Sequence, residues 1–485
     1  MAEHWNGPLE RIDDWRVRIP ADHVRGMRVP GMIYANDALM PLLTSDQAPQ
    51  QVVNVAHLPG IVGASIAMPD IHWGYGFPIG GVAAVSEEEG VISPGGVGYD
   101  INCGVRVVRT NLTLPDILDQ MKTLVDTLFQ NIPCGVGSTG KIKLSKTDQK
   151  NVLREGSAWA VSQGFGWAED LEFTEAGGRI QEADPNRLSN RALERGRQQL
   201  GTLGSGNHFI EIQEVTEVFD PVAAKAYGLK KGQITIMIHT GSRGLGYQVC
   251  DDHLDVMVRA MQKYKIRVPD QQLACAPVKS PEGEQYLAAM AAAANYAWAN
   301  RQVIVHWVRE SFESVLETPS EKMKMHMIYD VAHNIAKREI HPVDGIDTSL
   351  VVHRKGATRA FGPGHPDLPR SYQTVGQPVL IPGDMGTSSY ILCGTSKAME
   401  ETFGSTCHGA GRVMSRHAAI RATQGRALAR ELEDKGIQVR SRSKRTLAEE
   451  APEAYKDIHQ VVNVVDSAGI ASKVARMRPL GVIKG

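Results

Sequence analysis

The chain has 485 residues, of which 42% are hydrophobic and 22% are charged, a composition typical of a globular protein with a large buried core. Its formal net charge of −1 excludes an overall positive field for nucleic acid, so any basic contact surface must be local. The six scattered cysteines form no CxxC pair, the first residues hold no apolar signal core, and no run of about 18 apolar residues occurs. We therefore expect a cytoplasmic protein with reduced thiols and no membrane segment.

The predicted elements follow one another without the regular alternation of a doubly wound sheet or a barrel. Short apolar runs alternate with glycine and proline turns over residues 60–110, which predicts strands and loops. Further along, helices are predicted at 113–132, within 145–200, and at 245–265, 284–317, 321–340 and 409–434, and strands at 207–215, at 234–240 and, with glycine loops, across 350–395. This order favours an irregular α+β fold, with a mixed β-sheet core and surrounding helices. We expect one large domain over residues 1–485, in which residues 1–50 could form a small N-terminal subunit.

Three segments carry side chains that bind transition metals. SPGGVGYDINCGVR places Asp100 three residues before Cys103, GSGNHFIEI contains His208, and His239 ends a buried apolar strand. A fourth candidate, His333, would share a helical face with neighbouring apolar residues. Taken alone, Asp100, Cys103, His239 and His333 are more often structural than ligands, whereas the segment with His208 favours neither interpretation. Thiolate and imidazole together favour a divalent transition metal, zinc by affinity order. The sequence does not show that these residues converge.

The segment GSGNHFIEI raises a question of geometry. In a strict strand Asn207 and Glu211 would face one side and His208 the other. All three can serve one site only if the backbone is irregular near Gly206. The alternative is an exposed strand start with no function.

The stretch STCHGAGR, residues 405–412, sets Cys407 beside His408 among small residues. Cys407 is the default nucleophile by intrinsic reactivity, whereas His408 could attack phosphorus and give a phosphoramidate. Neighbours in an extended segment point opposite ways, so we expect only one of the two to face a pocket. Helical N–H groups after Gly411 could face an anion, and Arg412 could pair with a phosphate.

Three further motifs are basic. Their phosphate-binding candidates are Arg243 in GSRGLG, then Arg354, Lys355 and Arg359 in HRKGATR, and Arg440, Arg442, Lys444 and Arg445 in VRSRSKR. The alternative for each motif is a solvated basic face. From the residues alone, the chemistry indicated is metal-dependent phosphoryl transfer.

The motifs YDINCGVR, GSGNHFIEI, HTGSRGLG, YDVAHN, HRKGATR, STCHGAGR, EEAPEAYKDI and PLGVIKG resemble those of the RtcB family of RNA-splicing ligases, from about residue 20 to the end. The resemblance implies an RtcB-like catalytic domain that uses GTP and manganese. It would join RNA ends bearing a 2′,3′-cyclic phosphate or 3′-phosphate to 5′-hydroxyl ends, in tRNA splicing or RNA repair. An archease-type protein is a possible activating partner.

The resemblance also implies roles for residues. His408, not Cys407, would be the nucleophile that takes GMP, and Cys103 would lie between two manganese ions. The full metal set would be Asp100, Cys103, His208, His239 and His333, and the guanylate contacts Asn207, Phe209, Glu211, Asn334, Ser389, Gly409, Arg412, Tyr455 and Lys484. Because Lys484 is the penultimate residue, the tail must fold back into the pocket. Two rival interpretations are a metal-dependent cyclic-phosphate RNA phosphoesterase without ligation and an RNA-binding or chaperone module with a structural metal. Dependence on GTP distinguishes a ligase from the phosphoesterase, and covalent guanylation distinguishes it from the binding module.

Overall fold

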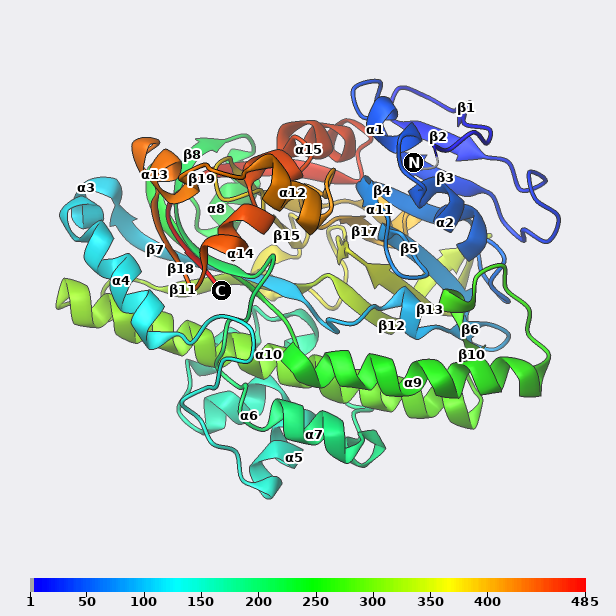
Figure 1. The fold of residues 1–485 in the computed structure, drawn as a ribbon, viewed down its shortest axis with the longest axis horizontal. Helices are drawn as coiled ribbons and strands as arrows, with labels where there is room; N and C mark the ends of the chain where they lie inside the picture. The colour runs from blue at the N-terminus through cyan, green and yellow to red at the C-terminus, as the bar shows by residue number, and fades with distance from the viewer. Residues whose placement is uncertain (1–3) are drawn as a thin grey trace.

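The computed structural model describes residues 4–485, which build two large β-sheets above a layer of long helices (Figure 1). The first sheet has the strand order β1-β2-β3-β4-β5-β13-β12, and only β3 and β4 are parallel neighbours. Its strands are β1 (Glu10–Arg11), β2 (Arg16–Ile19), β3 (Gly31–Tyr34), β4 (Ser65–His72), β5 (Ile79–Ser86), β12 (Asn334–Val343) and β13 (Ile346–Lys355). The strands of the first 50 residues thus extend a sheet that later segments complete.

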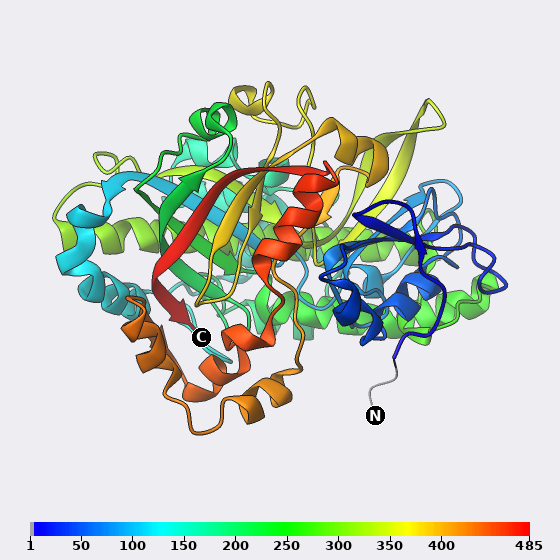
Figure 2. The same ribbon diagram turned by 90° about the horizontal axis from the view of Figure 1, so that it is seen from above.

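The second sheet has eight strands and carries most of the site. Its order is β11-β7-β9-β8-β19-β16-β15, and β18 pairs in parallel with β19. Its strands are β7 (Gly104–Thr113), β8 (Phe209–Val218), β9 (Gln233–Thr240), β11 (His326–Ala332), β15 (Pro378–Ile381), β16 (Ser389–Gly394), β18 (Gln438–Ser441) and β19 (Ala471–Lys484). Seen from above, β19 sweeps through one half of the molecule while the N-terminal strands lie in the other (Figure 2).

Two short antiparallel pairs complete the β structure: β6 (Val91–Ile92) with β10 (Ala276–Pro277), and β14 (Ala357–Arg359) with β17 (Ser405–Cys407). Strand β13 runs into β14 through Gly356, which adopts a φ of +59°. The β14–β17 pair is therefore connected to the first sheet through β13, and residues 405–408 lie opposite Gly356.

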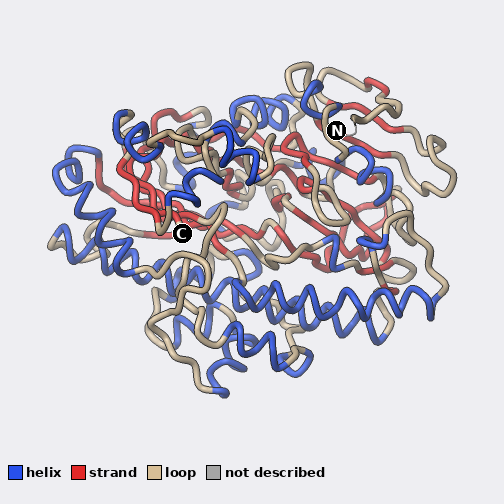
Figure 3. The backbone as a smooth tube through the Cα atoms, viewed as in Figure 1, coloured by secondary structure: helices blue, strands red, loops and turns tan. Residues whose placement is uncertain are grey.

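The longest helices, α9 (Arg243–Tyr264) and α10 (Pro281–Leu316), form the layer beneath the strands (Figure 3). Helix α10 begins at a capping serine, whose hydroxyl accepts the Gly283 N–H, and its alanine-rich middle is buried. The other helices are α1 (Met40–Thr44), α2 (Ala48–Val55), α3 (Leu114–Ile117), α4 (Met121–Asn131), α5 (Lys146–Glu155), α6 (Ser157–Ser162), α7 (Asn190–Gly196), α8 (Pro221–Tyr227), α11 (Ser396–Glu401), α12 (Arg416–Ala422), α13 (Leu428–Asp434), α14 (Lys444–Glu449) and α15 (Ile458–Ser467). Within residues 4–485, no helix has the length and apolarity needed to cross a membrane.

The predicted α+β class is confirmed, and so are the strands at 207–215 and 234–240 and the helices at 245–265 and 284–317. All six cysteines are free, as expected. Two helix predictions are wrong. Residues 321–340 contain β11 and most of β12, with His333 in the bend between them, and residues 409–434 form a loop followed by α12 and α13.

Candidate active site

The order of the second sheet brings the predicted metal ligands to one edge. Strands β7, β9 and β8 are antiparallel neighbours, so the start of β7, the end of β9 and the start of β8 lie together. Cys103 precedes β7, His208 precedes β8, and His239 pairs with both Val105 and Phe209. His333 joins them because Ala332, the last residue of β11, pairs with Gly104.

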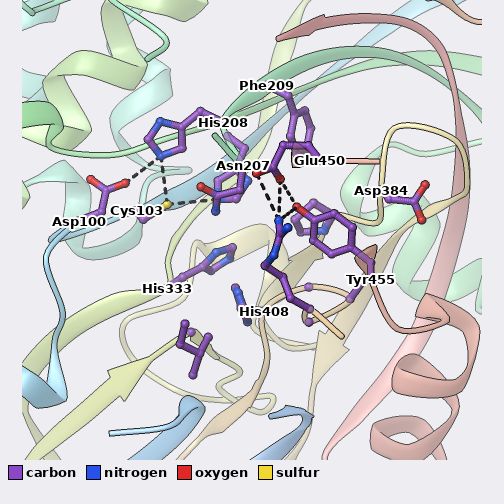
Figure 4. Close-up of a pocket in the computed structure, with 18 of the residues that line it drawn as sticks. Asp100, Cys103, Asn207, His208, Phe209, His333, Asp384, His408, Glu450 and Tyr455 are labelled. Carbon is purple, nitrogen blue, oxygen red and sulfur yellow. Dashed lines mark hydrogen bonds and ion pairs between the residues drawn. The ribbon is translucent and has the colours of Figure 1, made fainter. Parts of the chain in front are cut away.

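These side chains form a compact cluster (Figure 4). The Nε2 of His208 lies 2.8 Å from the Oδ2 of Asp100 and 3.5 Å from the Sγ of Cys103. The Nε2 of His239 lies 3.2 Å from the same sulfur, and the ring centroids of His239 and His333 are 5.7 Å apart. Asp100, Cys103 and His208 thus place their ligand atoms within 4.8 Å of one another, and the imidazoles of His239 and His333 lie beside them on the cavity wall.

The cluster fits a divalent transition metal. The Oδ1 of Asp100, the Nδ1 of His239 and both ring nitrogens of His333 are buried without a hydrogen-bond partner. Burial lowers the pKa of His208, His239 and His333, so the three rings are neutral, as metal ligation requires. Burial would raise the pKa of Asp100, but the interaction with the His208 imidazole and the nearby charge of Arg243 outweigh burial and hold that pKa at about 2. A carboxylate, a thiol and neutral imidazoles are the donors that such ions accept.

Helix α10 supports this cluster from below. The guanidinium of Arg301 donates to the backbone oxygens of Asn102, at 2.8 Å, and Thr240, at 2.9 Å, each next to a predicted ligand. It is held in turn by the buried carboxylate of Asp330, at 2.7 Å. A buried helix thereby fixes the backbone next to Cys103, before β7, and next to His239, at the end of β9.

His408 lies at the end of β17, 5.3 Å from the ring centroid of His333. Its Nδ1 lies 2.5 Å from the Oδ2 of Asp70, which also accepts the backbone N–H of His408. Burial would raise the pKa of Asp70, but the interactions with the His408 ring and backbone N–H and the charge of Lys456 outweigh burial and lower that pKa. Asp70 therefore stays a carboxylate, keeps the His408 proton on Nδ1 and leaves Nε2 as the free nitrogen. Cys407 is fully buried in the core, so of the two neighbours only His408 faces the pocket.

The cluster and His408 line one cavity of about 500 Å³. Its far wall is formed by Phe209, Asp384, Glu450 and Tyr455 (Figure 4). Glu211 also lines the cavity. Burial raises the pKa of Glu211 to about 8, which means that the carboxyl group is largely protonated at neutral pH.

Two cations cross this wall. Lys484 reaches from the end of β19, where its Nζ donates to the Gly206 oxygen at 3.1 Å and lies 3.8 Å from Glu450. Arg412 also contacts Glu450, at 3.3 Å, and the Tyr455 hydroxyl, at 3.1 Å. The wall combines an aromatic ring, acceptors and cations, which are the groups that bind a nucleoside phosphate.

A model of the family described as "tRNA-splicing ligase RtcB" matches residues 51–485. The chain belongs to the RtcB family. It is 58% identical over 478 residues to the tRNA-splicing ligase RtcB of Thermococcus kodakarensis, covering 99% of each chain. It is 55% identical over 477 residues to the protein of the same name from Methanococcus maripaludis, covering 98% of this chain and 99% of the relative. It is 56% identical over 479 residues to the tRNA-splicing ligase RtcB of Archaeoglobus fulgidus, covering 99% of each chain.

The structure brings together the residues that the RtcB resemblance singled out, with one exception. All of them line the cavity except Ser389, whose hydroxyl accepts the N–H of the lining residue Gly383 at 3.2 Å. Asn334 lines the cavity, but its side-chain amide already donates to the backbone oxygen of Asp100 and accepts the N–H of Gly356. The backbone is irregular at Gly206, whose φ is +73°. Such an irregularity is what allows His208 to face the same side as Asn207 and Glu211. Asn207, His208 and Glu211 consequently share the cavity.

The basic motifs behave differently from one another. Arg354 and Arg359 are buried, and they bind Glu339 and Gln377 rather than facing a ligand. Arg243 lies 3.2 Å from the Nδ1 of His208. In VRSRSKR, Arg440 is paired with Asp126 and Arg445 with Glu449. Of the HRKGATR cations only Lys355 lines the cavity.

The sequence analysis missed Asp70, Asp384 and Glu450. Asp70 lies inside a buried run of β4, in SIAMPDIH, where all residues but the last are buried. The sequence did contain a signal for Asp70, because a charged residue is unusual in such a buried run. Proline- and glycine-rich turns follow it, as they often do near a functional site. The other two lie in the loops before β16 and after α14, where a carboxylate is common and carries no such signal.

Proposed function

We propose that the protein is a GTP- and manganese-dependent RNA ligase. It joins RNA 3′-phosphate or 2′,3′-cyclic phosphate ends to 5′-hydroxyl ends, in tRNA splicing or RNA repair in the cytoplasm. The observation that carries this proposal is the His408 imidazole, held by Asp70, between a metal-binding cluster and a wall suited to a nucleoside phosphate. The names of the relatives, tRNA-splicing ligases, support it.

Two manganese ions would be held by Asp100, Cys103, His208, His239 and His333. Bound divalent ions would supply positive charge to the phosphate oxygens of the substrates. Arg301 of α10 would hold two of these ligands in place before any ion binds, because it binds the backbone next to Cys103 and His239.

In the first covalent step, the Nε2 of His408 attacks the α-phosphorus of GTP. A phosphorus–nitrogen bond forms, the bond between the α and β phosphates breaks, and pyrophosphate leaves. Asp70 keeps the proton on Nδ1 and stabilises the positive charge that develops on the ring. The product is a guanylated histidine.

In the next step, an oxygen of the RNA 3′-phosphate attacks the same phosphorus and the bond to His408 breaks. The RNA end now carries GMP through a new phosphoanhydride, and the 5′-hydroxyl of the second RNA displaces GMP as the ends join. Where the RNA ends in a cyclic phosphate, addition of water must first open the ring to a 3′-phosphate. GMP is needed because a phosphate monoester dianion resists attack by a hydroxyl group.

The far wall carries the groups that would bind the purine nucleotide GTP. As a carboxylate, Glu211 would accept hydrogen bonds from the N1–H and the amino group of guanine. Because its pKa is about 8, the group can ionise at a pH only slightly above neutral. Phe209 and Tyr455 offer ring surfaces, while Lys484 and Arg412 supply positive charge. Asn207, Asn334, Ser389 and Gly409 complete the guanylate contacts in this proposal.

The test uses two RNA strands, one ending in a 2′,3′-cyclic phosphate and one beginning with a 5′-hydroxyl group. With manganese and an archease-type activating protein supplied, we expect joined RNA only when GTP is present. Opening of the cyclic phosphate without joining, at the same rate with and without GTP, would contradict the proposal. That result would favour a phosphoesterase.

A further inference from the structure

A second pocket, of about 540 Å³, lies at the opposite end of the second sheet from the candidate active site. It opens where β7 and β8 end and where β9 begins. Strand β9 runs from Gln233 at this pocket to His239 at the metal cluster, so the two places are about 20 Å apart at roughly 3.3 Å per residue. Among the described residues, none lines both cavities. The pocket is therefore a separate feature of the fold.

The lining of this pocket is basic. Its charged side chains are all cations, namely Arg109, Lys225, Lys230, Lys231 and Lys324. Within residues 4–485, no carboxylate forms an ion pair with any of the five. Because the whole chain has a formal net charge of −1, these side chains form a local concentration of positive charge. We call this feature the basic pocket.

Arg109 is partly buried in the basic pocket, yet its hydrogen-bond donors are free. Its guanidinium makes no hydrogen bond to a protein atom in the described part of the chain. It lies flat against Gly228, where the φ is +70° and an added Cβ would come within 2.7 Å of the arginine Nε. A planar guanidinium with free donors inside a pocket is suited to bind a phosphate group.

Gln233 holds together the segments that surround this arginine. Its side-chain N–H groups donate to the backbone oxygens of Thr110 and Gly228, and its side-chain oxygen accepts the backbone N–H of Lys230 at 2.9 Å. These bonds join the end of β7, the end of α8 and the loop before β9. The backbone of the basic pocket is thus fixed, while the Lys230 side chain remains exposed.

The composition of the basic pocket favours the phosphates of a large RNA over other anions. Four of its five cations are exposed lysines, which contact phosphates as mobile point charges and do not enclose a small ligand. Of the described aromatic side chains, none lines the pocket, whereas aromatic residues commonly anchor protein interfaces. A surface of this kind holds RNA through its backbone and does not read its sequence.

We infer that the basic pocket binds the folded body of an RNA whose ends react in the distant active-site cavity. The near-zero net charge of the chain gives no overall attraction for RNA, so a local surface must supply it. The inference rests on the proposed function for the choice of RNA as the anion. It adds a contact surface outside the active site, which large folded RNAs reach and short RNAs do not.

The first test removes two charges with the double variant Lys230→Gln/Lys231→Gln. The manganese-loaded protein is titrated, at several salt concentrations, with a folded RNA of tRNA size and with a trinucleotide that has the same 3′-phosphate end. We expect the folded RNA to bind about tenfold more weakly, and its slope of log K against log salt to fall in magnitude by about 2. The trinucleotide should bind as it does to the natural protein.

The matched control is Lys263→Gln/Lys279→Gln. It removes the same charge from two partly exposed lysines, at the end of α9 and before α10, which are paired with Glu282 and Glu88. The control should bind both RNAs as the natural protein does. Unchanged binding of the folded RNA to the Lys230→Gln/Lys231→Gln variant, or an equal loss for the trinucleotide, would overturn the inference.

A second probe, polyglutamate, distinguishes RNA from an acidic protein. We expect the natural protein and the Lys230→Gln/Lys231→Gln variant to bind this polymer equally weakly. If the variant instead keeps its affinity for folded RNA and loses affinity for polyglutamate, the pocket is a site for an acidic protein and the inference is wrong.

The natural protein offers a test without substitutions. Folded RNA should protect Lys225, Lys230 and Lys324 from chemical acetylation several-fold, whereas the trinucleotide should not. Equal acetylation with and without folded RNA would contradict the inference. If the natural protein joins no RNA with GTP and manganese, the proposed ligase function fails, and these binding and protection measurements still decide the role of the basic pocket.

Discussion

His408 depends on Asp70 for its orientation and its tautomer. We expect Asp70→Asn to slow guanylation by GTP about a hundredfold or more, because an amide can leave the proton on the wrong ring nitrogen. The rate of label uptake, measured beside the thermal unfolding midpoint, checks this. A rate within threefold of the natural protein, at an unchanged midpoint, would show that Asp70 does not set the tautomer.

We expect Glu211 to make GTP binding depend on pH. Its pKa of about 8 lies above the ordinary 4.5, so in the free protein this group's contribution to stability is complete below 4.5 and is lost as pH rises through 8. Guanine requires the ionised form as an acceptor, so the half-saturating GTP concentration should fall between pH 6.5 and 8.5. Glu211→Gln should weaken binding and flatten this profile. An equally steep profile in the variant would assign the pH dependence to another group.

At the scale of elements, α10 supports the proposed metal ligands. Arg301→Met leaves the Asp330 carboxylate buried with one cation fewer and frees the loops at Asn102 and Thr240. We expect a loss of about 3–5 kcal/mol in the free energy of unfolding and weaker manganese binding. Denaturant unfolding and metal titration measure both.

The matched control is Arg338→Met. Arg338 forms a partly exposed ion pair with Glu87, so its removal should cost about 0–1 kcal/mol and leave metal binding unchanged. Equal losses in the two variants would show that the α10 network has no special role.

The elements that sequence patterns predicted correctly are those with a length or periodicity signal of their own. Helices α9 and α10 are long, and strands β8 and β9 are short apolar runs bounded by glycine or polar turns. The segment 321–340 was mistaken for a helix because its first strand, β11, is buried on both faces and so lacks the alternation of a half-buried strand. Periodicity alone cannot distinguish such a strand from a buried helix.

The segment 409–434 failed for a different reason, which is tertiary. Gly411 has a φ of +74°, and a Cβ there would lie 2.3 Å from the Asp70 oxygen. Because the backbone at Gly411 packs directly against β4, no helix forms before α12. The contact joins residues about 340 positions apart, so no local sequence pattern could indicate it. For the same reason the sequence indicated His408 but not its partner Asp70.

At the scale of the whole molecule, the cavity lies where separate parts of the fold meet. Asp70 comes from the first sheet, the metal ligands from the edge of the second, and His408 from the short pair that hangs between them. The final strand, β19, pairs with β8 and β16 and delivers Lys484 into the cavity. The site therefore exists only in the fully assembled chain.

Such a site should couple metal binding to global stability. Nitrogen and sulfur donors bind zinc more tightly than manganese, so zinc should raise the unfolding temperature more than manganese at equal concentration. We also expect zinc to support ligation poorly, since manganese is the ion in the proposed reaction. Thermal unfolding and joined RNA are measured in the same metal series. Equal ligation rates with the two ions would contradict this expectation.

The central claim is that His408 carries GMP. The most direct measurement incubates the protein with GTP labelled at the α-phosphate and manganese, and then maps the labelled residue after denaturation. The account predicts an acid-labile, alkali-stable adduct on His408, absent from His408→Ala and largely retained in Cys407→Ala. Label that persists in His408→Ala and disappears in Cys407→Ala would contradict it.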